Sequence, residues 1–235
     1  MSPPASRYRL GTPRVHYRRI DSTNERARAL AAAGAPHGTL VTADEQSAGR
    51  GRQGRRWTAP AGRALLCSVV IRDPSRLLPL ACGVAVAEVV GDGARVKWPN
   101  DLLVDGRKVA GILVEARPQE GWAVAGIGLN VALRERDFPP ELAATAGTLG
   151  LEPEAVEDTL GRLLDALSRW TVAASDEVLE AFRARDALLG AEMRWAEGQG
   201  RGAGIDGDGR LLVETDDGRV ALDAGEVHLL RPAAR

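Results

Sequence analysis

The most informative segment of this 235-residue chain reads Lys97-Trp98-Pro99-Asn100-Asp101-Leu102-Leu103-Val104-Asp105-Gly106-Arg107-Lys108-Val109-Ala110-Gly111-Ile112-Leu113-Val114-Glu115. Its central Asp-Gly dipeptide separates two apolar runs and favours the type I′ turn of a β-hairpin. The proline fixes its own φ and keeps the preceding residue extended. A lysine, an amide and a carboxylate therefore meet at a turn that leaves a short strand. This group suits catalysis, although an ordinary Asx turn uses the same residue types.

Lys97 and Lys108 are the only lysines among 31 basic residues, and all the others are arginine. A compact ammonium and a planar guanidinium are not interchangeable at a phosphate or carboxylate site. Gly111 lies on the same strand as Lys108, and a glycine inside a strand leaves room for a ligand or another backbone. Gly126 and Gly128 leave similar room on a neighbouring strand. We interpret these residues as parts of one anion-binding site on a sheet.

Regular elements are expected on both sides of the hairpin. Residues 1–17 read as an irregular lead. Ser22 and Glu25 have the spacing of a capping box and Gly34 is a typical C-cap, so a helix is predicted between them. Apolar spacing predicts strands at 38–44, 65–72, 95–98 and 122–131, and helices at 77–90, 156–172 and 178–188. This order indicates an α+β fold with a mixed, largely antiparallel sheet and flanking helices.

The chain changes character after Leu189. Short alternating segments are separated by hairpin-type dipeptides, namely Asp206-Gly207, Asp208-Gly209 and Asp217-Gly218. Four or five short strands in about forty residues are typical of a small β-barrel. We therefore predict a catalytic domain at 1–188 and a small barrel domain at 189–235.

The composition argues against several classes of protein, including those that bind nucleic acid through bulk charge and those that span a membrane. Lys plus Arg number 31 and Asp plus Glu 32, and the net charge of -1 argues against a bulk electrostatic grip on nucleic acid. The 44% hydrophobic and 27% charged residues are typical of a globular protein. Cys67 and Cys82 have neither zinc-ligand nor disulfide-framework spacing. Without a membrane-length apolar run or a secretory signal, a cytoplasmic protein is expected.

A Gly/Arg loop is defined by Gln46-Ser47-Ala48-Gly49-Arg50-Gly51-Arg52-Gln53-Gly54-Arg55-Arg56-Trp57. Its glycines let the backbone approach a ligand closely, and its arginines offer forked donors for phosphate or carboxylate oxygens. Trp57 can stack on a base or close an apolar pocket. The loop is neither a Walker loop nor a dinucleotide fingerprint. A solvated basic surface loop is the other interpretation.

Together these motifs closely resemble those of bacterial biotin–protein ligases. The resemblance rests on Asp21-Ser22-Thr23-Asn24, on Gln46 with the Gly/Arg loop, on the lysine segment and on Gly126-Ile127-Gly128-Leu129-Asn130. It implies a class II synthetase-like catalytic domain and a C-terminal SH3-like β-barrel. It also implies an enzyme that activates biotin with ATP and Mg²⁺ to biotinyl-5′-adenylate. The enzyme would then pass biotin to one lysine of a carrier protein.

The resemblance further implies a role for each matching residue. The catalytic groups would be Lys108, Arg52 and Asp101, with Lys108 at the biotin carboxylate and Asp101 at the acceptor amine. The biotin-binding residues would be Ser22, Thr23, Asn24, Gln46, Arg50, Gly51, Arg52, Lys108 and Gly111. The ATP-binding residues would be Arg50, Arg52, Trp57, Lys97, Asn100, Lys108, Ile112 and Asn130, with Trp57 on the adenine side. Mg²⁺ is expected on the ATP phosphates.

The expected partner is the biotin carboxyl carrier protein of acetyl-CoA carboxylase. A homodimer through an exposed sheet edge is also possible. Some bacterial relatives carry an N-terminal winged helix that binds an operator. Here Asp21 lies too near the start for such a domain, so no DNA partner is expected. No membrane partner is expected either.

Other functions stay open at this stage. A lipoate-type protein ligase of related fold is one alternative, although the Gly/Arg loop argues against it. Comparing isotope exchange with biotin and with lipoate would separate the two. A single-stranded nucleic-acid-binding module is another, using the loop arginines beside a small barrel. It would not need Lys108, and the -1 net charge and 4% aromatic residues weaken it. An inactive relative is a third alternative, but every charged position of the motifs is filled.

Overall fold

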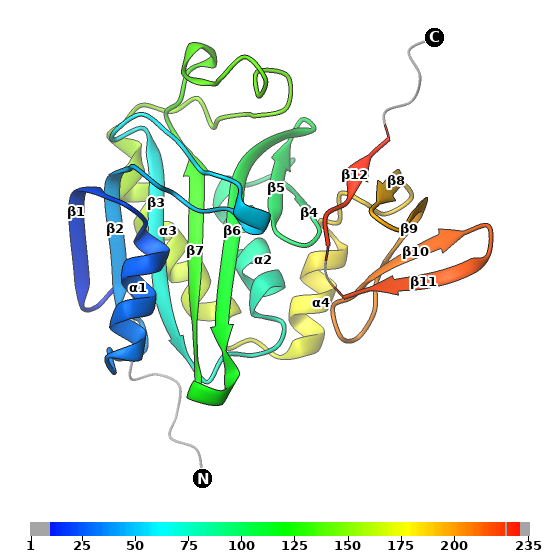
Figure 1. Cartoon of the computed structure of the whole chain (residues 1–235), viewed down its shortest axis with the longest axis horizontal. Coiled ribbons are helices and arrows are strands. Elements are labelled where there is room, and N and C mark those ends of the chain that lie inside the picture. The colour runs from blue at the N-terminus through cyan, green and yellow to red at the C-terminus, as the bar shows by residue number, and fades with distance from the viewer. Residues whose placement is uncertain (1–9, 224, 231–235) are drawn as a thin grey trace.

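The chain folds into two β-sheets with helices on the larger one, as the computed structural model in Figure 1 shows for residues 10–223 and 225–230. The larger sheet contains β1 (Arg14–Ile20), β2 (Leu40–Gln46), β3 (Ala64–Arg72), β4 (Arg95–Lys97), β5 (Asp101–Val104), β6 (Arg107–Arg117) and β7 (Trp122–Asn130). The smaller sheet contains β8 (Glu192–Trp195), β9 (Gly198–Ile205), β10 (Leu211–Thr215), β11 (Gly218–Leu222) and β12 (His228–Leu229). The helices are α1 (Thr23–Ala32), α2 (Leu78–Val90), α3 (Ala155–Trp170) and α4 (Ser175–Arg183), with short 3-10 turns η2 (Arg52–Gly54), η3 (Pro118–Glu120) and η4 (Glu135–Asp137).

The larger sheet has the strand order β1-β2-β3-β7-β6-β5-β4. β1 runs parallel to β2, and every other neighbouring pair is antiparallel. The smaller sheet, in the order β11-β10-β9-β8-β12, is antiparallel. The predicted α+β fold with a mixed, largely antiparallel sheet is confirmed.

The predicted hairpin joins β5 to β6. Asp105 and Gly106 form its turn, with φ values of 49° and 72°. Both values are positive, as a type I′ turn requires, and glycine adopts such a φ without steric cost. The Asp-Gly signal in the sequence therefore identified this turn correctly.

The pairing of β5 with β6 slips by one residue beyond this turn. Leu103 pairs with Lys108, whereas Leu102 pairs with Ala110. Lys108 shares a face of the sheet with its partner Leu103 and with Asp101, and the β-bulge at Val109 puts Gly111 on that face as well. In a regular strand Lys108 and Gly111 would point to opposite faces, because side chains alternate along a strand.

Helices cover the two faces of the larger sheet unequally. α1 and the Gly/Arg loop lie on one face, and α2 and α3 lie on the other (Figure 1). Ala27 and Ala31 of α1 pack with Val41, Val70 and Val124 in a small apolar cluster. α2 is buried on almost every side, between the sheet and α3. In the described part of the chain, no helix combines the length and apolarity that crossing a membrane requires.

The apolar core continues from the larger sheet into the smaller one. Leu188 and Met193 belong to the same buried cluster as Leu78 of α2. The indole Nε1 of Trp98 donates a hydrogen bond to the carbonyl of Gly209 at 3.0 Å. This bond ties the β9–β10 turn to the segment that follows β4. The smaller sheet is therefore fixed against the site-bearing end of the larger sheet.

Five short strands follow Leu189, as predicted, although the turn before β11 falls at Asp216-Asp217 and Gly218 is already in the strand. Because one apolar cluster runs across this region, the division into domains at 1–188 and 189–235 stays a prediction.

Two boundaries predicted from the sequence are wrong. Residues 14–17 belong to β1, an edge strand whose alternating exposed arginines hide its apolar pattern. The helix predicted at 178–188 is α4, which ends at Arg183. The helix ends there because the residues that follow it pair with Val96 of β4. The Val96 N–H donates to the carbonyl of Arg185, and the Val96 carbonyl accepts from the N–H of Ala187.

We predict that the two thiols are unreactive in the folded protein. Cys67 and Cys82 are free and fully buried, and burial raises the pKa of each thiol to about 12. Thiolate is the reactive species, so the reagent DTNB at about pH 8 should release almost no thionitrobenzoate until denaturant is added. Rapid release from the native protein would contradict this burial.

Candidate active site

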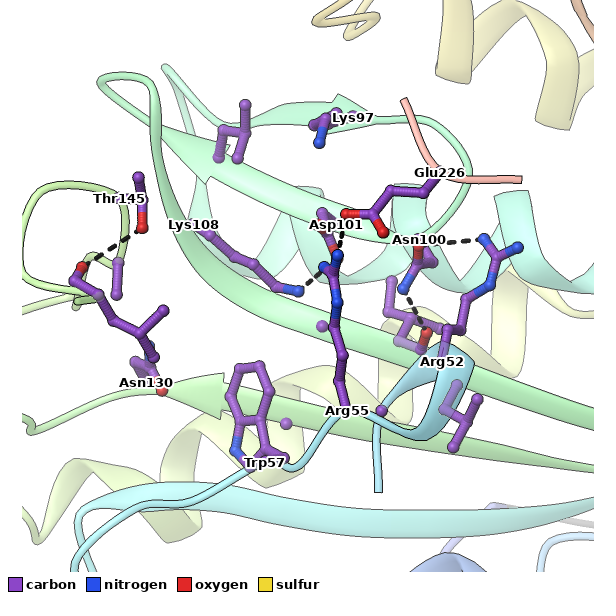
Figure 2. A pocket seen from close by; sticks show the side chains of 18 of the residues that line it. Arg52, Arg55, Trp57, Lys97, Asn100, Asp101, Lys108, Asn130, Thr145 and Glu226 are labelled. Atoms are coloured by element: carbon purple, nitrogen blue, oxygen red, sulfur yellow. Dashed lines mark hydrogen bonds and ion pairs between the residues drawn. The ribbon is translucent and has the colours of Figure 1, made fainter. Parts of the chain in front are cut away.

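A cavity of about 990 Å³ lies on the face of the larger sheet that also carries α1, and its rim includes part of the smaller sheet. Every residue that the sequence proposed for the site lines it. These residues are Ser22, Thr23, Asn24, Gln46, Arg50, Gly51, Arg52, Trp57, Lys97, Asn100, Asp101, Lys108, Gly111, Ile112 and Asn130. Figure 2 labels some of the lining side chains, with Arg52 and Arg55 of the Gly/Arg loop directed toward the β4–β5 turn.

One end of the cavity is uncharged and polar. The backbone N–H and the hydroxyl of Thr23 both donate to Oε1 of Gln46, at 2.8 and 3.1 Å. The hydroxyl of Ser68 donates to Oδ1 of Asn24 at 2.6 Å and lies 2.8 Å from the Thr23 hydroxyl. Ser22 caps α1 by accepting from the backbone N–H of Glu25. The α1 N-terminus is therefore held to β2 and β3 by a continuous hydrogen-bond chain.

Sequence reasoning missed Ser68, which is fully buried in β3. Its neighbours along the strand are apolar, so its hydroxyl needs partners from another element. A single serine inside an otherwise apolar strand was the available signal. It became meaningful only when β3 and the start of α1 were placed together.

The floor of the cavity is a flat glycine surface under an indole ring. Gly111 of β6 pairs directly with Gly128 of β7. A Cβ atom at either position would lie 2.9 or 2.5 Å from the ring of Trp57. Only glycine permits this approach, and the space that the two glycines leave is filled by the Trp57 ring. The indole Nε1 is buried and has no hydrogen-bond partner among the described residues.

The other end of the cavity is cationic. Lys108 Nζ lies 2.6 Å from a carboxylate oxygen of Asp101 and 5.8 Å from the centre of the Trp57 ring. Burial lowers the pKa of Lys97, and the neighbouring Lys108 ammonium lowers it further, while Asp101 opposes both. A bound anion would relieve this unfavourable burial of positive charge. The two lysines are therefore arranged to receive an anion between them and the loop arginines.

Arg52 reaches the β4–β5 turn from the Gly/Arg loop. Its guanidinium donates to Oδ1 of Asn100 at 3.2 Å, and the Asn100 amide donates to the carbonyl of Ile112 at 3.1 Å. Burial lowers the pKa of Arg52, yet a guanidinium stays protonated in proteins. Arg52 thus bridges the cavity and presents a permanent positive charge to it, as Figure 2 shows.

Glu226 of the smaller sheet's terminal segment also lines the cavity, and sequence reasoning missed it. It forms an ion pair with Arg55 of the Gly/Arg loop (Figure 2). Burial alone would raise the pKa of Glu226, but Arg55, His228 and Lys97 hold that pKa below its usual value. No local pattern marks this glutamate, because its partner is far away in the sequence.

Arg50 has carboxylate partners as well. Its guanidinium lies 2.5 Å from Glu25 of α1 and 3.9 Å from Glu115 of β6. Acidic side chains of other elements therefore pair with Arg50 and Arg55 when no ligand is bound.

Asn130 joins the cavity wall to the segment that follows β7. Its amide donates to the carbonyl of Gly147 at 2.8 Å. The backbone N–H of Lys108 donates to the carbonyl of Thr145 at 2.7 Å. These bonds hold the loop between β7 and α3 against the turn end of the hairpin. Leu142 and Phe138 of this loop add apolar surface to the cavity.

The arrangement suits a composite ligand. A neutral polar group fits the hydroxyl and amide end, and a flat ring fits the glycine floor beside Trp57. Phosphate or carboxylate oxygens fit the end with Lys97, Lys108 and Arg52. Fixed cations that face two anions lower the repulsion between them, so the cavity can promote a reaction that joins two anionic groups.

Comparisons with known proteins match both parts of the chain. Residues 16–131 match the Biotin/lipoate A/B protein ligase family, and residues 198–230 match the Biotin protein ligase C terminal domain. The chain is 36% identical to a biotin--[acetyl-CoA-carboxylase] ligase of Paracoccus denitrificans, an alignment that covers 89% of this chain and 97% of that protein. It is 32% identical to the bifunctional ligase/repressor BirA of Bacillus subtilis, over 94% of this chain and 75% of that protein.

A solved structure has the same fold. It is a biotin protein ligase from Aquifex aeolicus in complex with biotin and ATP. The TM-score is 0.77 and the sequence identity 29%, with 94% of this chain and 100% of that chain covered.

We predict that Gly126→Ala destabilises the fold through the polar end of the cavity. A Cβ there would lie 1.8 Å from Oδ1 of the buried, hydrogen-bonded Asn24, so the strand or α1 must shift. Overpacking of this kind costs about 1–3 kcal/mol of unfolding free energy, measurable by urea denaturation. Gly161→Ala is the matched control, since its Cβ meets nothing within 4 Å on α3. It should be neutral or stabilising, because alanine favours helix. Equal stability of the two variants would rule out the clash.

Proposed function

The chain belongs to the biotin/lipoate A/B protein ligase family and is a biotin–protein ligase, and on that premise we propose how its residues carry out the two steps of the reaction. Biotin is first activated with ATP to biotinyl-5′-adenylate and is then transferred to an acceptor protein. One observation supports the assignment of roles above all others. A single cavity collects the hydroxyl and amide end, the glycine floor and the cationic end.

The polar end suits the ureido ring of biotin, which is neutral and both donates and accepts hydrogen bonds. Thr23 occupies Oε1 of Gln46 with two hydrogen bonds. The Gln46 amide nitrogen is therefore left for the cavity. Ser22 and Asn24 complete this end of the cavity, and Arg50 and Gly51 border it from the loop. Gly111 would leave room for the ring and the aliphatic chain of biotin.

The first step brings two anions together. A carboxylate oxygen of biotin attacks the α-phosphorus of ATP, a new P–O bond forms, and the bond to the β-phosphate breaks to release pyrophosphate. Lys108 would contact the biotin carboxylate and the α-phosphate. Arg52 and Lys97 would contact the phosphate oxygens. Because these cations are fixed before the ligands arrive, they stabilise the charge of the transition state without reorganisation.

The adenine ring would stack beside Trp57, which lies on the glycine floor. Asn100, Ile112 and Asn130 would complete the ATP side of the cavity, while the loop held by Asn130 covers it. Excluding water protects the mixed anhydride from hydrolysis.

In the second step the acceptor lysine attacks the acyl carbon of biotinyl-5′-adenylate. An amide bond forms, the bond between the acyl carbon and the phosphate oxygen breaks, and AMP leaves with its electron pair. The amine must lose a proton, and Asp101 is the carboxylate placed to orient the amine and accept that proton. Lys108, 2.6 Å from Asp101, stays available to the leaving phosphate.

Mg²⁺ is expected to enter with ATP. Among the described residues, no group of three or more His, Cys, Asp or Glu side chains could hold a metal ion alone. Mg²⁺ commonly binds through one or two carboxylates together with substrate phosphates. Asp101 and Glu226 supply such carboxylates in the cavity wall and fit this mode. When bound, the ion would neutralise phosphate charge.

The acceptor that we propose is the biotin carboxyl carrier protein of acetyl-CoA carboxylase, as the names of the relatives suggest. The cytoplasm is the proposed location, because both cysteines are free and a reducing compartment keeps thiols so. The absence of sequence-specific DNA binding stays a prediction, supported by the net charge of -1.

A homodimer could form at a free sheet edge. β6 pairs with β7 as far as Arg117, but among the described residues it pairs with β5 only as far as Gly111. Residues 113–117 therefore have no strand partner on the β5 side of β6, and such an edge readily adds a strand. We expect sedimentation to detect a dimer that Ala116→Lys weakens. A strict monomer with biotin and ATP present would exclude the homodimer.

Lys108→Ala should abolish adenylate synthesis in a folded protein. The variant loses the ammonium that lies 2.6 Å from Asp101 and beside the glycine floor, so adenylate formation should fall about 100-fold or more. Mass spectrometry after incubation with biotin, ATP and Mg²⁺ measures this, and lipoate in place of biotin tests substrate choice. Arg169→Ala, which removes a surface ion pair with Glu88, is the control. Near-normal synthesis by folded Lys108→Ala would remove Lys108 from the mechanism.

Arg52→Gly should let the adenylate escape. The variant loses the bond that joins the Gly/Arg loop to Asn100, so the loop closes less firmly. Release of adenylate should speed up about tenfold or more, and lysines of an added bystander protein should become biotinylated. Arg56→Gly adds the same backbone freedom at an exposed residue of the same loop. Equal escape from both variants would show that backbone freedom, and not the Asn100 contact, controls retention.

A further inference from the structure

Glu115 has no role in the scheme above, yet its side chain touches two parts of the site from outside the cavity. It lies on β6, on the same face as Leu113 and Gly111, because alternate residues of a strand share a face. Its side chain is 24% exposed and it is absent from the cavity lining. The carboxylate is therefore held between β6, α1 and the Gly/Arg loop.

One carboxylate oxygen fixes the Asn24 amide. Asn24 Nδ2 donates to Oε2 of Glu115 at 2.9 Å and to the carbonyl of Leu113 at 3.2 Å. On the other side of the amide, Oδ1 accepts from Ser68 at 2.6 Å. The two acceptors beside Asn24 Nδ2 and the donor beside Asn24 Oδ1 define a single orientation of the Asn24 amide. That orientation sets the Ser68 hydroxyl and, through Thr23, the Gln46 amide that faces the cavity.

The other carboxylate oxygen belongs to a charge network that includes the loop. Glu115 Oε1 lies 3.4 Å from Arg28 and 3.9 Å from Arg50. Glu25 completes the network, at 3.2 Å from Arg28 and 2.5 Å from Arg50. Two carboxylates thus alternate with two guanidinium groups. A network of this kind restrains its members more than an isolated surface pair does.

We propose that Glu115 is a positioning residue for two parts of the site. It holds the Asn24 amide for biotin, and it holds the Arg50 side chain for closure of the Gly/Arg loop. This inference rests on the proposed biotin-binding role of Asn24 and the Gly/Arg loop. The two oxygens act separately: Oε2 needs only to accept a hydrogen bond, whereas Oε1 needs a negative charge. Replacement of the carboxylate by an amide therefore separates the two actions.

Three purified variants test the proposal: Glu115→Ala, Glu115→Gln and the control Glu157→Ala. Glu157 pairs with Arg14 far from the cavity, so its loss removes a surface carboxylate without touching the site. For each variant, the KM for biotin, kcat, and the rate at which preformed biotinyl-5′-adenylate escapes are measured. Arg50→Ala and the double variant Glu115→Gln/Arg50→Ala complete a double-mutant cycle for the loop contact.

Glu115→Ala should raise the KM for biotin about three- to tenfold, with a smaller change in kcat, and should speed adenylate escape by a similar factor. Glu115→Gln should restore the KM to within about twofold of wild type, because its amide oxygen still accepts from Asn24. Its escape rate should stay raised, and Arg50→Ala should raise escape by a smaller factor in the Glu115→Gln background than in the wild type. Glu157→Ala should behave as wild type.

Wild-type KM and escape in Glu115→Ala would overturn the proposal. Equal loss of both properties in the alanine and glutamine variants would overturn the separate action of the two oxygens. If Glu115→Ala does not fold, Glu115→Gln and the double-mutant cycle with Arg50→Ala still test the action of Glu115 on the loop. Additive effects of Glu115→Gln and Arg50→Ala on adenylate escape would contradict that action. Failure of the wild-type enzyme to form biotinyl-5′-adenylate would instead count against the proposed function, whatever the variants do.

Discussion

A one-residue slip in strand pairing places a lysine and a glycine of β6 on the same face of the larger sheet. Lys108 pairs with Leu103, whereas Ala110 pairs with Leu102, so the bulge at Val109 brings Lys108 to the face of Gly111. In a regular strand these two residues, three positions apart, would point to opposite faces, and burial of an unpaired lysine on the α2 side would be costly. Lys108 instead lies 2.6 Å from Asp101 and next to the glycine floor. The meeting of the lysine with the glycine floor follows from this local departure from regular pairing.

The second constraint is electrostatic. The cavity gathers two lysines and several arginines before any anion is present, and such a cluster would repel itself if its members were left alone. Asp101, Glu226, Glu25 and Glu115 each supply a carboxylate to one of these cations. The cations are therefore held in place in the free protein. A ligand anion then meets groups whose positions are already set, which is the condition for electrostatic catalysis.

The smaller sheet contributes to the cavity as well as to the core. Its residues share the buried cluster of α2, and Trp98 is bonded to the β9–β10 turn beside the lysine segment. Glu226 then reaches the Gly/Arg loop through Arg55. This ion pair gives the C-terminal part of the chain a direct contact with the Gly/Arg loop of the site.

The sequence alone determined the features that depend on neighbouring residues. Asp105-Gly106 specified a type I′ turn, Ser22 specified the start of α1, and glycine at 111 and 128 marked where a ring could approach the sheet. The resemblance of the motifs then identified the family, and every residue that this resemblance proposed for the site lines the cavity. Only the tertiary structure decided the partners of those residues. Glu115 and Glu226 carry no local signal of function, and the lone serine of β3, Ser68, gains a meaning only from its partners. Each of the three acts on a residue brought near by strand pairing or by packing of the second sheet. The bulge at Lys108 belongs to the same class, since strand register depends on the fit of whole faces and not on the pair of residues at the slip.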